Sequence, residues 1–242
     1  MDEQGDLFAP GLAEALAPAV IAPAADPCAE LRDRFAAFGA AGLDEGDTLA
    51  LVLSRCLRPG LNPVGAADAL LRRFGGVGRI FGATEPELAR VIGRDAACEL
   101  TLLHALLLRV LKHPLRQRTV LGSTEAVKTY LRARLAALPR EVFHVLFLDR
   151  KNQLIADERL GVGTVDHAPV YPREVARRAL ELSASAILLA HNHPSGDPTP
   201  SRADIDMTKQ VAEAVKVLQI VVYDHFIVAG DQVVSLKALG LM

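Results

Sequence analysis

One short stretch, Ala190 to Asp204, constrains the fold of this chain most strongly, because it places three potential metal ligands within fifteen residues. The apolar run at residues 186–190 leads into this stretch, is short and contains no Gly or Pro, and therefore predicts a buried strand. Side chains two residues apart in a strand lie on the same face. His191 and His193 are therefore expected to point toward one cation, while Asn192 points away from them.

The residues after the second histidine predict a loop followed by a helix. The run at residues 195–200 contains two prolines, which lack N–H donors, among residues that favour turns. Ser201 fits an N-cap, and a helix is expected from about Arg202 to Leu218. Asp204 then lies in the first turn, where the helix dipole favours an ionised carboxylate, so it can act as a third ligand. Three protein ligands leave one position on a zinc ion open for water.

Each part of this pattern has a simpler interpretation when it is taken alone. Ser201 and Asp204 also form an ordinary capping box, and either histidine can have a purely structural role. The combination favours a zinc site. His191-Asn192-His193-Pro194 followed by Ser201 and Asp204 resembles the JAMM (MPN+) metalloprotease motif. The form with Asn between the histidines and Pro-Ser-Gly after them is similar to the RadC family.

This resemblance implies a fold and a chemistry. The fold is an α/β (α+β) JAMM/MPN-like sandwich with a cytidine-deaminase-like layout, preceded by a small all-helical domain that is helix-hairpin-helix-like. The cofactor that the resemblance implies is Zn²⁺, held by His191, His193 and Asp204. The activity that it implies is that of a zinc-dependent hydrolase, a metallopeptidase or isopeptidase with a peptide or isopeptide substrate. The hydroxyl of Ser201 is expected to help hold the oxyanion or the zinc-bound water.

Such a reaction also needs a general base, and the family places a glutamate at the start of a strand that follows a helix. Glu141 matches that position, because it follows Pro139 and precedes the predicted strand at residues 142–148. Glu158, near the far end of a predicted hairpin, and Glu174, in the first turn of a predicted helix, are its competitors. We therefore expect Glu141 to be the base.

Composition limits the other classes of function. The chain has 242 residues, 50% of them hydrophobic, and two domains are expected. Its 27 Lys and Arg nearly balance 29 Asp and Glu, so no overall basic field attracts nucleic acid. The three cysteines are odd in number and widely spaced, which favours reduced thiols. An acidic amino terminus argues against a signal peptide, and no membrane segment is expected, so the predicted location is cytoplasmic.

The pattern of elements divides the chain into four parts. Residues 1–28 are an Ala- and Pro-rich segment that predicts a flexible tail, and residues 29–113 predict a helical bundle. Pro114 is expected to end the last long helix of that bundle and to open a linker at residues 114–122. Residues 123–242 form the predicted metal-binding domain, in which strands are expected at 219–223, 225–228 and 233–236.

A second function remains open: a DNA-repair-associated nucleic-acid-binding protein whose metal is structural or vestigial. In RadC-type proteins the place of Val91 to Ala97 is taken by a helix-hairpin-helix turn. Such turns use two glycines so that backbone N–H groups can approach a phosphate. Here only Gly93 is present, and Asp95 places a negative charge where the phosphate would lie, so at most weak DNA contact is expected. A homodimer also stays open. His225 is expected to be a core or supporting residue, and His144 and His167 to be structural or surface groups.

Overall fold

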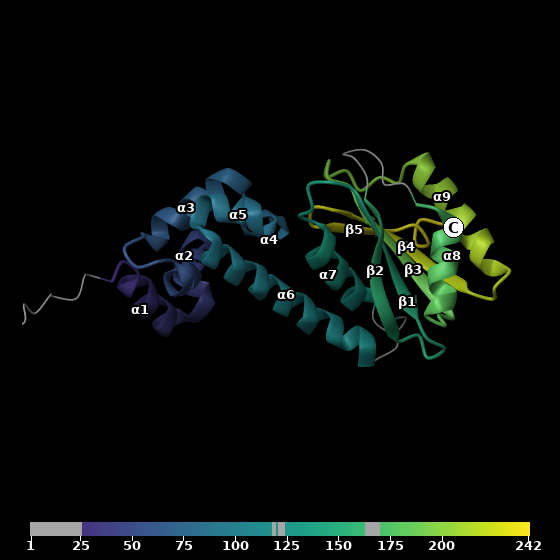
Figure 1. Ribbon diagram of the computed structural model, residues 1–242, viewed down its shortest axis with the longest axis horizontal. Coiled ribbons are helices and arrows are strands. Elements are labelled where there is room, and N and C mark those ends of the chain that lie inside the picture. Colours follow the sequence, from purple (N-terminus) through teal and green to yellow (C-terminus); the bar gives the residue numbers. More distant parts are fainter. Residues whose placement is uncertain (1–25, 118–119, 121–123, 163–169) are drawn as a thin grey trace, which may run out of the picture.

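The computed structural model describes residues 26–117, 120, 124–162 and 170–242 (Figure 1). The predicted tail at residues 1–28 lies almost entirely outside these ranges, as does His167. An all-helical region comes first in the chain, and a five-stranded sheet with helices packed on both faces follows it. The expected α+β domain preceded by helices is therefore confirmed.

The helical region consists of short helices that share one apolar core. The elements are α1 (Ala29–Phe38), the 3-10 turn η1 (Gly39–Gly42), α2 (Glu45–Cys56), α3 (Pro63–Phe74), α4 (Val77–Gly82) and α5 (Glu85–Ile92). Asn62 caps α3 by accepting a hydrogen bond from the amide of Val64 at 3.0 Å, as its sequence position predicts. Leu53, Leu70 and Leu100 are fully buried in the shared core. The sequence pattern does not predict α4, because six residues ending in Gly show no helical periodicity.

The long helix α6 (Arg94–Gln117) runs from the helical region to the sheet (Figure 1). Leu100 near its start lies in the helical core, whereas Leu115 near its end lies in a core beneath the sheet. Pro114 lies inside α6, so the expectation that it ends the helix is wrong, and residues 114–117 are helical. A proline inside a helix costs about 3 kcal/mol. Burial of Leu115, which is 1% exposed, offsets much of that cost.

The sheet is mixed, and its central strand leads to the histidines. Its elements are α7 (Thr124–Leu135), β1 (Val142–Leu148), β2 (Leu154–Val162), α8 (Pro172–Glu181), β3 (Ala186–Asn192), α9 (Arg202–Lys216), β4 (Val221–Ala229) and β5 (Gln232–Ser235). The strand order is β2-β1-β3-β4-β5, in which only β3 and β4 pair in parallel. A parallel pair needs a crossover connection, and α9 forms it.

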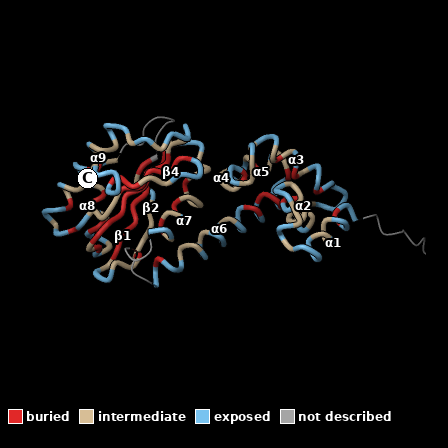
Figure 2. The backbone as a smooth tube through the Cα atoms, turned by 180° about the vertical axis from the view of Figure 1, so that it is seen from behind, coloured by how far each residue is buried: buried red, intermediate tan, exposed pale blue. Residues whose placement is uncertain are grey.

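Alternate side chains of the central strands enter two separate cores. Leu146 and Leu188 pack toward α7 on one face, and Val145 and Leu189 pack toward α8 and α9 on the other. Both β1 and β3 are buried along their whole length (Figure 2). This explains why the two strands are continuously apolar in sequence instead of alternating. The end of β3 is therefore a rigidly packed position for a binding site.

Two strand predictions need correction. The strands expected at 219–223 and 225–228 form one strand, β4, that runs through Asp224. The strand tolerates this half-buried carboxylate because it accepts hydrogen bonds from the amide of His225 at 2.7 Å and the hydroxyl of Ser235 at 2.6 Å. The second strand of the predicted hairpin, which its β-forming residues place at 153–156, extends to Val162 as β2.

Two predictions from composition can be compared with the structure. Cys28, Cys56 and Cys98 are all free thiols, as their spacing predicts. No helix within the described ranges is long and apolar enough to cross a membrane.

Candidate metal centre

Both histidines come from the carboxyl end of β3. His191 is the sixth residue of the strand, is fully buried and pairs with Phe143 of β1 and Ile227 of β4. His193 follows the strand directly, and its amide still donates to the carbonyl of Val228 at 2.8 Å. The extended backbone therefore holds both imidazoles on one face, and their Nε2 atoms lie 2.9 Å apart.

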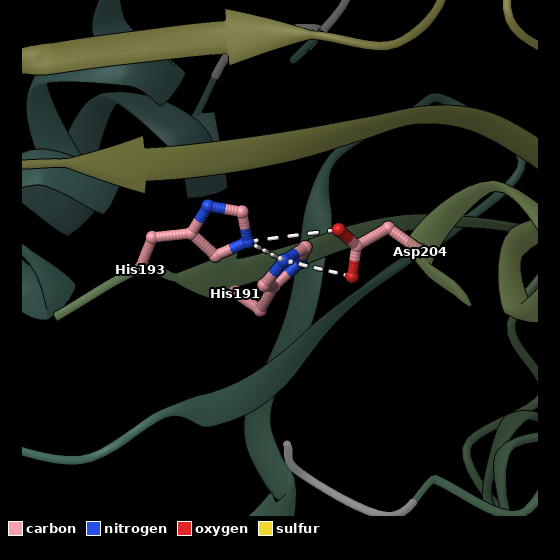
Figure 3. A group of neighbouring side chains, drawn as sticks. All are labelled: His191, His193 and Asp204. Carbon is pink, nitrogen blue, oxygen red and sulfur yellow. Dashed lines mark hydrogen bonds and ion pairs between the residues drawn. The ribbon is translucent and has the colours of Figure 1, made fainter. Parts of the chain in front are cut away.

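The third member of the group, Asp204, arrives from the first turn of α9 (Figure 3). Its Oδ1 lies 3.2 Å from Nε2 of His191, and its Oδ2 lies 3.6 Å from Nε2 of His193. Each of the three residues offers one ligand atom, and these atoms lie within 4.8 Å of one another. No other group of this kind occurs among the residues that the structure describes. The structure therefore brings the three predicted ligands together.

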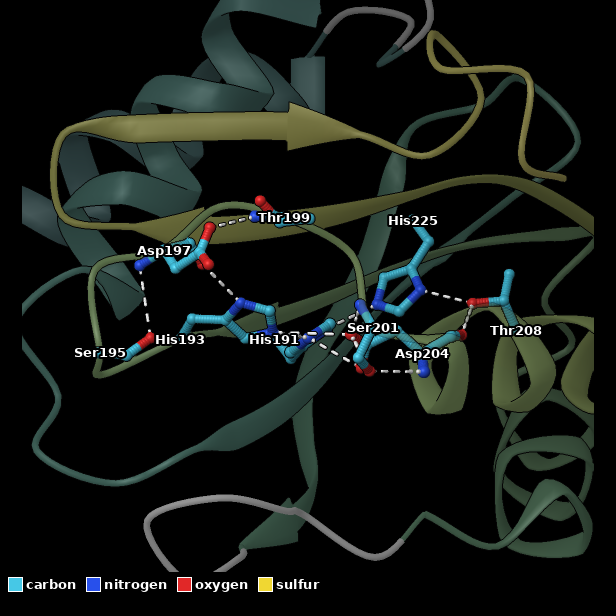
Figure 4. A network of polar contacts seen from close by, with 9 residues as sticks. All are labelled: His191, His193, Ser195, Asp197, Thr199, Ser201, Asp204, Thr208 and His225. Atoms are coloured by element: carbon cyan, nitrogen blue, oxygen red, sulfur yellow. Dashed lines mark hydrogen bonds and ion pairs between the residues drawn. The ribbon is translucent and has the colours of Figure 1, made fainter.

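Ser201 fixes the position of Asp204 through a capping box (Figure 4). The amide of Asp204 donates to the Ser201 hydroxyl at 3.1 Å, and the Ser201 amide donates to Oδ2 of Asp204 at 2.8 Å. The Ser201 hydroxyl also donates to that Oδ2 at 2.6 Å. Capping and support of the carboxylate are therefore the same contact, so the two interpretations of Ser201 and Asp204 do not exclude each other.

The charges of the group suit a cation. Burial alone would raise the pKa of Asp204, but hydrogen bonds with His191 and His193 outweigh it and hold that pKa well below its usual range. The pKa of His193 is raised, first by its hydrogen bond with Asp204 and against the effect of its partial burial. Two imidazole nitrogens and an ionised carboxylate form a donor set that zinc prefers. A metal ion at this point would take the place of the protons that now join the three side chains.

A chain of buried polar contacts orients His191 through its Nδ1 atom, on the side of the ring opposite Asp204. Its Nδ1 lies 2.8 Å from Nε2 of His225, and Nδ1 of His225 lies 2.6 Å from the hydroxyl of Thr208. That hydroxyl donates to the backbone carbonyl of Asp204 at 2.5 Å, which closes the chain on α9. Burial lowers the pKa of His225 far below its usual range, so this imidazole stays neutral. The prediction that His225 is a core or supporting residue is confirmed.

Glu141 lies directly before β1 and is 9% exposed. Its negative charge contributes to the raised pKa of His193, after the larger effects of Asp204, burial and the carbonyl of Asp197. The antiparallel pairing of Phe143 with His191 places Glu141 at the same end of the two strands as His193. The backbone beside it is held by Asn192, whose Oδ1 accepts from the amide of Val142 at 2.9 Å and whose Nδ2 donates to the carbonyl of Arg140 at 3.0 Å. Asn192 therefore fixes the chain on both sides of Glu141.

The two competing glutamates have other partners. Both carboxylate oxygens of Glu158 accept hydrogen bonds from Arg178 at 2.6 Å. Glu174 accepts from Nε of Arg177 at 3.0 Å on the exposed side of α8. These ion pairs account for both residues without a metal. The role of Glu141 as a base nevertheless remains a prediction.

Sequence reasoning does not identify the supporting contacts. Thr208 and Asn192 are each a single buried polar residue, and the spacing shows only that Asn192 faces away from the histidines. The carbonyl of Asp197, 2.7 Å from Nδ1 of His193, is a backbone group and leaves no side-chain signal. One signal was available for Thr208: it lies four residues after Asp204, so both face the same side of α9.

Comparison with known families agrees with this geometry. A family model described as the RadC-like JAB domain matches residues 121–241. The matched segment contains the whole sheet, the three candidate ligands and Glu141, and begins just before α7. The helices at residues 29–117 precede it. By its fold, its His-His-Asp group and this match over half of its length, the chain belongs to the RadC family.

Proposed function

We propose that this protein is a zinc-dependent hydrolase of the JAMM type, a metallopeptidase or isopeptidase that acts on peptide or isopeptide bonds. The observation that carries the proposal is the convergence of His191, His193 and Asp204 at the end of a buried strand, with Glu141 close by. His191, His193 and Asp204 would hold the ion. When bound, zinc would supply Lewis-acid activation of water and of the scissile carbonyl.

Glu141 would transfer a proton from the attacking water to the leaving amine. Its carboxylate is largely buried, lies near His193 and is held in place through the backbone contacts of Asn192. A carboxylate at that position can accept a proton from the attacking water and return it to the leaving amine. An amine leaves poorly unless it is protonated, so both parts of this transfer are needed for amide cleavage.

Ser201 would assist in two ways. Its hydroxyl already donates to Oδ2 of Asp204, which keeps one carboxylate oxygen oriented and leaves Oδ1 directed at His191. A hydroxyl in this position can also reorient toward the oxygen that gains negative charge during attack on a carbonyl. The hydrogen bond of 2.6 Å between Ser201 and Asp204 supports the first role, and both roles are part of the proposal.

The rival function, nucleic-acid binding by the helical region, has less support. Gly93 ends α5 with a positive φ of 80°, and Arg94 opens α6 directly after it. The charges of this turn are paired: Arg94 lies 3.8 Å from Glu85, and Asp95 lies 3.7 Å from Arg58. A phosphate would have to compete with these carboxylates.

Metal analysis combined with a cleavage screen tests the proposed function. Protein purified without chelator should contain about one zinc per chain, as a site with three protein ligands predicts. The zinc-loaded protein should cleave members of a peptide and isopeptide library, and removal of the metal with a chelator should abolish cleavage. Zinc-loaded protein that cleaves no peptide or isopeptide would contradict the proposal. Salt-sensitive binding of duplex DNA by residues 29–117 would then favour the rival function.

A further inference from the structure

A cavity of ≈ 470 Å³ lies between the helical region and the metal centre. Its walls come from the helical region, from the turn after α7, from the loop after β3 and from the turn between β4 and β5. His193 is part of the lining, so the cavity opens directly beside the candidate metal centre. Binding sites for small ligands typically measure about 300–1,000 Å³ and lie at junctions of this kind.

Close packing maintains this junction. A Cβ atom added at Gly82 of α4 would lie 2.5 Å from the backbone oxygen of Ala137, so only glycine allows α4 to approach the turn after α7 this closely. A second contact joins the two parts nearby, where Nε2 of His104 lies 3.2 Å from the carbonyl of Ala133. The helical wall of the cavity is therefore held against the sheet domain by direct contact.

The helical wall presents two guanidinium groups, Arg73 and Arg79. Both are exposed, and among the described residues no carboxylate lies within 4.0 Å of either guanidinium group. The guanidinium carbon of Arg73 lies 5.6 Å from the centre of the Phe74 ring. Hydrogen bonds from Thr84 chiefly lower the pKa of Glu87, and the charge of Arg73 lowers it further. Arg79 is therefore the cation that is most available to a ligand in the cavity.

Two carboxylates, those of Glu87 and Asp231, also line the cavity, and they favour a peptide over a nucleic acid as its ligand. Glu87 is committed to the cap of α5, because its Oε2 accepts from the amide of Thr84 at 2.8 Å and from the hydroxyl of Thr84 at 2.6 Å. Asp231 is exposed in the turn between β4 and β5. A nucleic-acid strand brings a phosphate at every nucleotide and would be repelled by these groups. A peptide can bring a single carboxylate to Arg79 and avoid the other two.

We propose that this cavity binds the part of a peptide substrate next to the cleaved bond, and that Arg79 recognises a carboxylate in that part. The inference rests on the proposed peptidase function and names its substrate class: peptides that carry an acidic side chain or a free carboxyl terminus. The guanidinium group forms paired, charge-assisted hydrogen bonds with a carboxylate, which an amide of the same shape cannot replace.

A binding experiment separates this inference from catalysis. The full-length Glu141→Gln protein, loaded with zinc, is titrated into dye-labelled peptide pools, and fluorescence anisotropy gives the affinity. One pool contains Asp and Glu at the varied positions, and its partner contains Asn and Gln. Each is prepared with a free and with an amidated carboxyl terminus, which distinguishes the two sources of the carboxylate. The acidic or free-terminus pool should bind more tightly.

Variants then assign the preference to one side chain. Arg79→Gln should weaken binding of the preferred pool about tenfold and leave the amide pool unchanged. Arg72→Ala is the matched control, because Arg72 is exposed on α3, lies 4.0 Å from Asp68 and does not line the cavity. Gly82→Ala should also weaken binding, because the added Cβ forces α4 away from Ala137.

The outcomes distinguish the two proposals. If wild-type protein cleaves nothing but the acidic pool binds through Arg79, the peptidase proposal fails, and what holds of the cavity proposal is recognition of a peptide carboxylate by Arg79. If cleavage occurs without a carboxylate preference, or Arg79→Gln binds like wild type, the cavity proposal is overturned and the peptidase proposal remains. Tighter binding of a DNA oligonucleotide than of any peptide pool through Arg79 would also overturn it.

Discussion

The two faces of the sheet each carry a buried or half-buried cluster of histidine and carboxylate. On the α9 face, His191 and His193 meet Asp204 at the end of β3. On the α7 face, Nδ1 of His144 lies 2.9 Å from Oδ1 of Asp157, between β1 and β2. Both carboxylates have depressed pKa values. The two clusters nevertheless suit different purposes.

The difference lies in what surrounds each carboxylate. Asp157 accepts a hydrogen bond from Tyr130, and the cations of Lys112 and Arg134 lie 3.7 Å and 3.9 Å from its Oδ2. Its negative charge is already balanced by protein groups from α6 and α7. Asp204 has no lysine or arginine within 4.0 Å among the described residues, and faces two imidazole nitrogens instead. We therefore expect a histidine–carboxylate pair to bind a metal only where no lysine or arginine already lies beside the carboxylate.

The largest expected effect is on metal content. His191→Ala should lower zinc from about one equivalent to near zero, because it removes one of three ligands. His144→Ala is the matched control: it removes a buried histidine from the same sheet but leaves the three ligands intact. Elemental analysis of both proteins after dialysis against zinc measures the difference. Equal zinc content in the two variants would show that the α9 face is not the metal site.

How far the sequence predicts each cluster follows from its spacing. His191, His193 and Asp204 lie within one strand-loop-helix segment. Strand alternation pairs the two histidines, capping rules place Asp204 in the first helical turn, and the resemblance to the JAMM motif joins the three. The cluster around Asp157 draws residues from α6, α7, β1 and β2, which no local pattern connects. His144 therefore has no partner at ligand spacing in the sequence, although it has one in space.

The same distinction holds for the fold. Capped ends such as Asn62 and Ser201 are confirmed, because capping depends on neighbouring residues only. The position of Pro114 within α6 is not predictable in this way. The helix continues past Pro114 because Leu115 is buried in a core whose other residues come later in the sequence. The contacts of Asn192 with the backbone beside Glu141 are equally remote, across about fifty residues of sequence.

The next effect in size concerns proton transfer at the metal face. Glu141→Gln should retain zinc and lose hydrolysis by a factor of about 10²–10⁴, the usual contribution of a positioned general base. Gln keeps the size of the side chain but cannot accept the water proton near neutral pH. Zinc content and initial rates measured on the same preparation test this. Wild-type rates for Glu141→Gln, with an inactive but zinc-loaded Glu158→Gln, would mean that the base is misassigned.

A smaller effect is expected from the residue that holds Glu141. Asn192→Ala removes the acceptor of the Val142 amide and the donor to the Arg140 carbonyl, so the backbone on both sides of Glu141 loses its support. We expect kcat to fall about tenfold to a hundredfold with zinc content and KM little changed, since misplaced catalytic groups act on the chemical step.

Ser235→Ala provides the comparison for that variant. Ser235 is also buried, and its hydroxyl donates to Asp224 at 2.6 Å and accepts from the amide of Ala238 at 2.9 Å. Its loss should lower stability without lowering kcat. If both variants reduce kcat equally, Asn192 acts only through overall stability and has no specific effect on Glu141.

The smallest expected effect is on the free energy of unfolding, comes from Asp157 on the α7 face, and depends on pH. Burial raises the pKa of Asp157, but hydrogen bonds from His144 and Tyr130 and the charge of Lys112 outweigh it, and the pKa falls from 3.8 to about 2. Such a depression is worth about 2 kcal/mol of folding free energy at neutral pH. Asp157→Asn should therefore unfold at lower urea concentration than wild type at pH 7, while its zinc content stays normal.

The sign of the pH dependence follows from the depressed pKa. An unfolded Asp157 binds a proton more readily than the folded one, so its contribution is complete above about pH 5 and is lost as the pH falls through 3.8 toward about 2. The difference in unfolding free energy between wild type and Asp157→Asn should shrink over that interval.

Asp206→Asn, on the exposed side of α9, should differ from wild type by less than about 0.5 kcal/mol at every pH. A difference for Asp157→Asn that stays constant down to pH 2 would mean that lost packing, and not the charge, separates it from wild type. The cluster on the α7 face would then contribute to stability by shape alone, and its balanced charges would not distinguish it from the cluster on the α9 face.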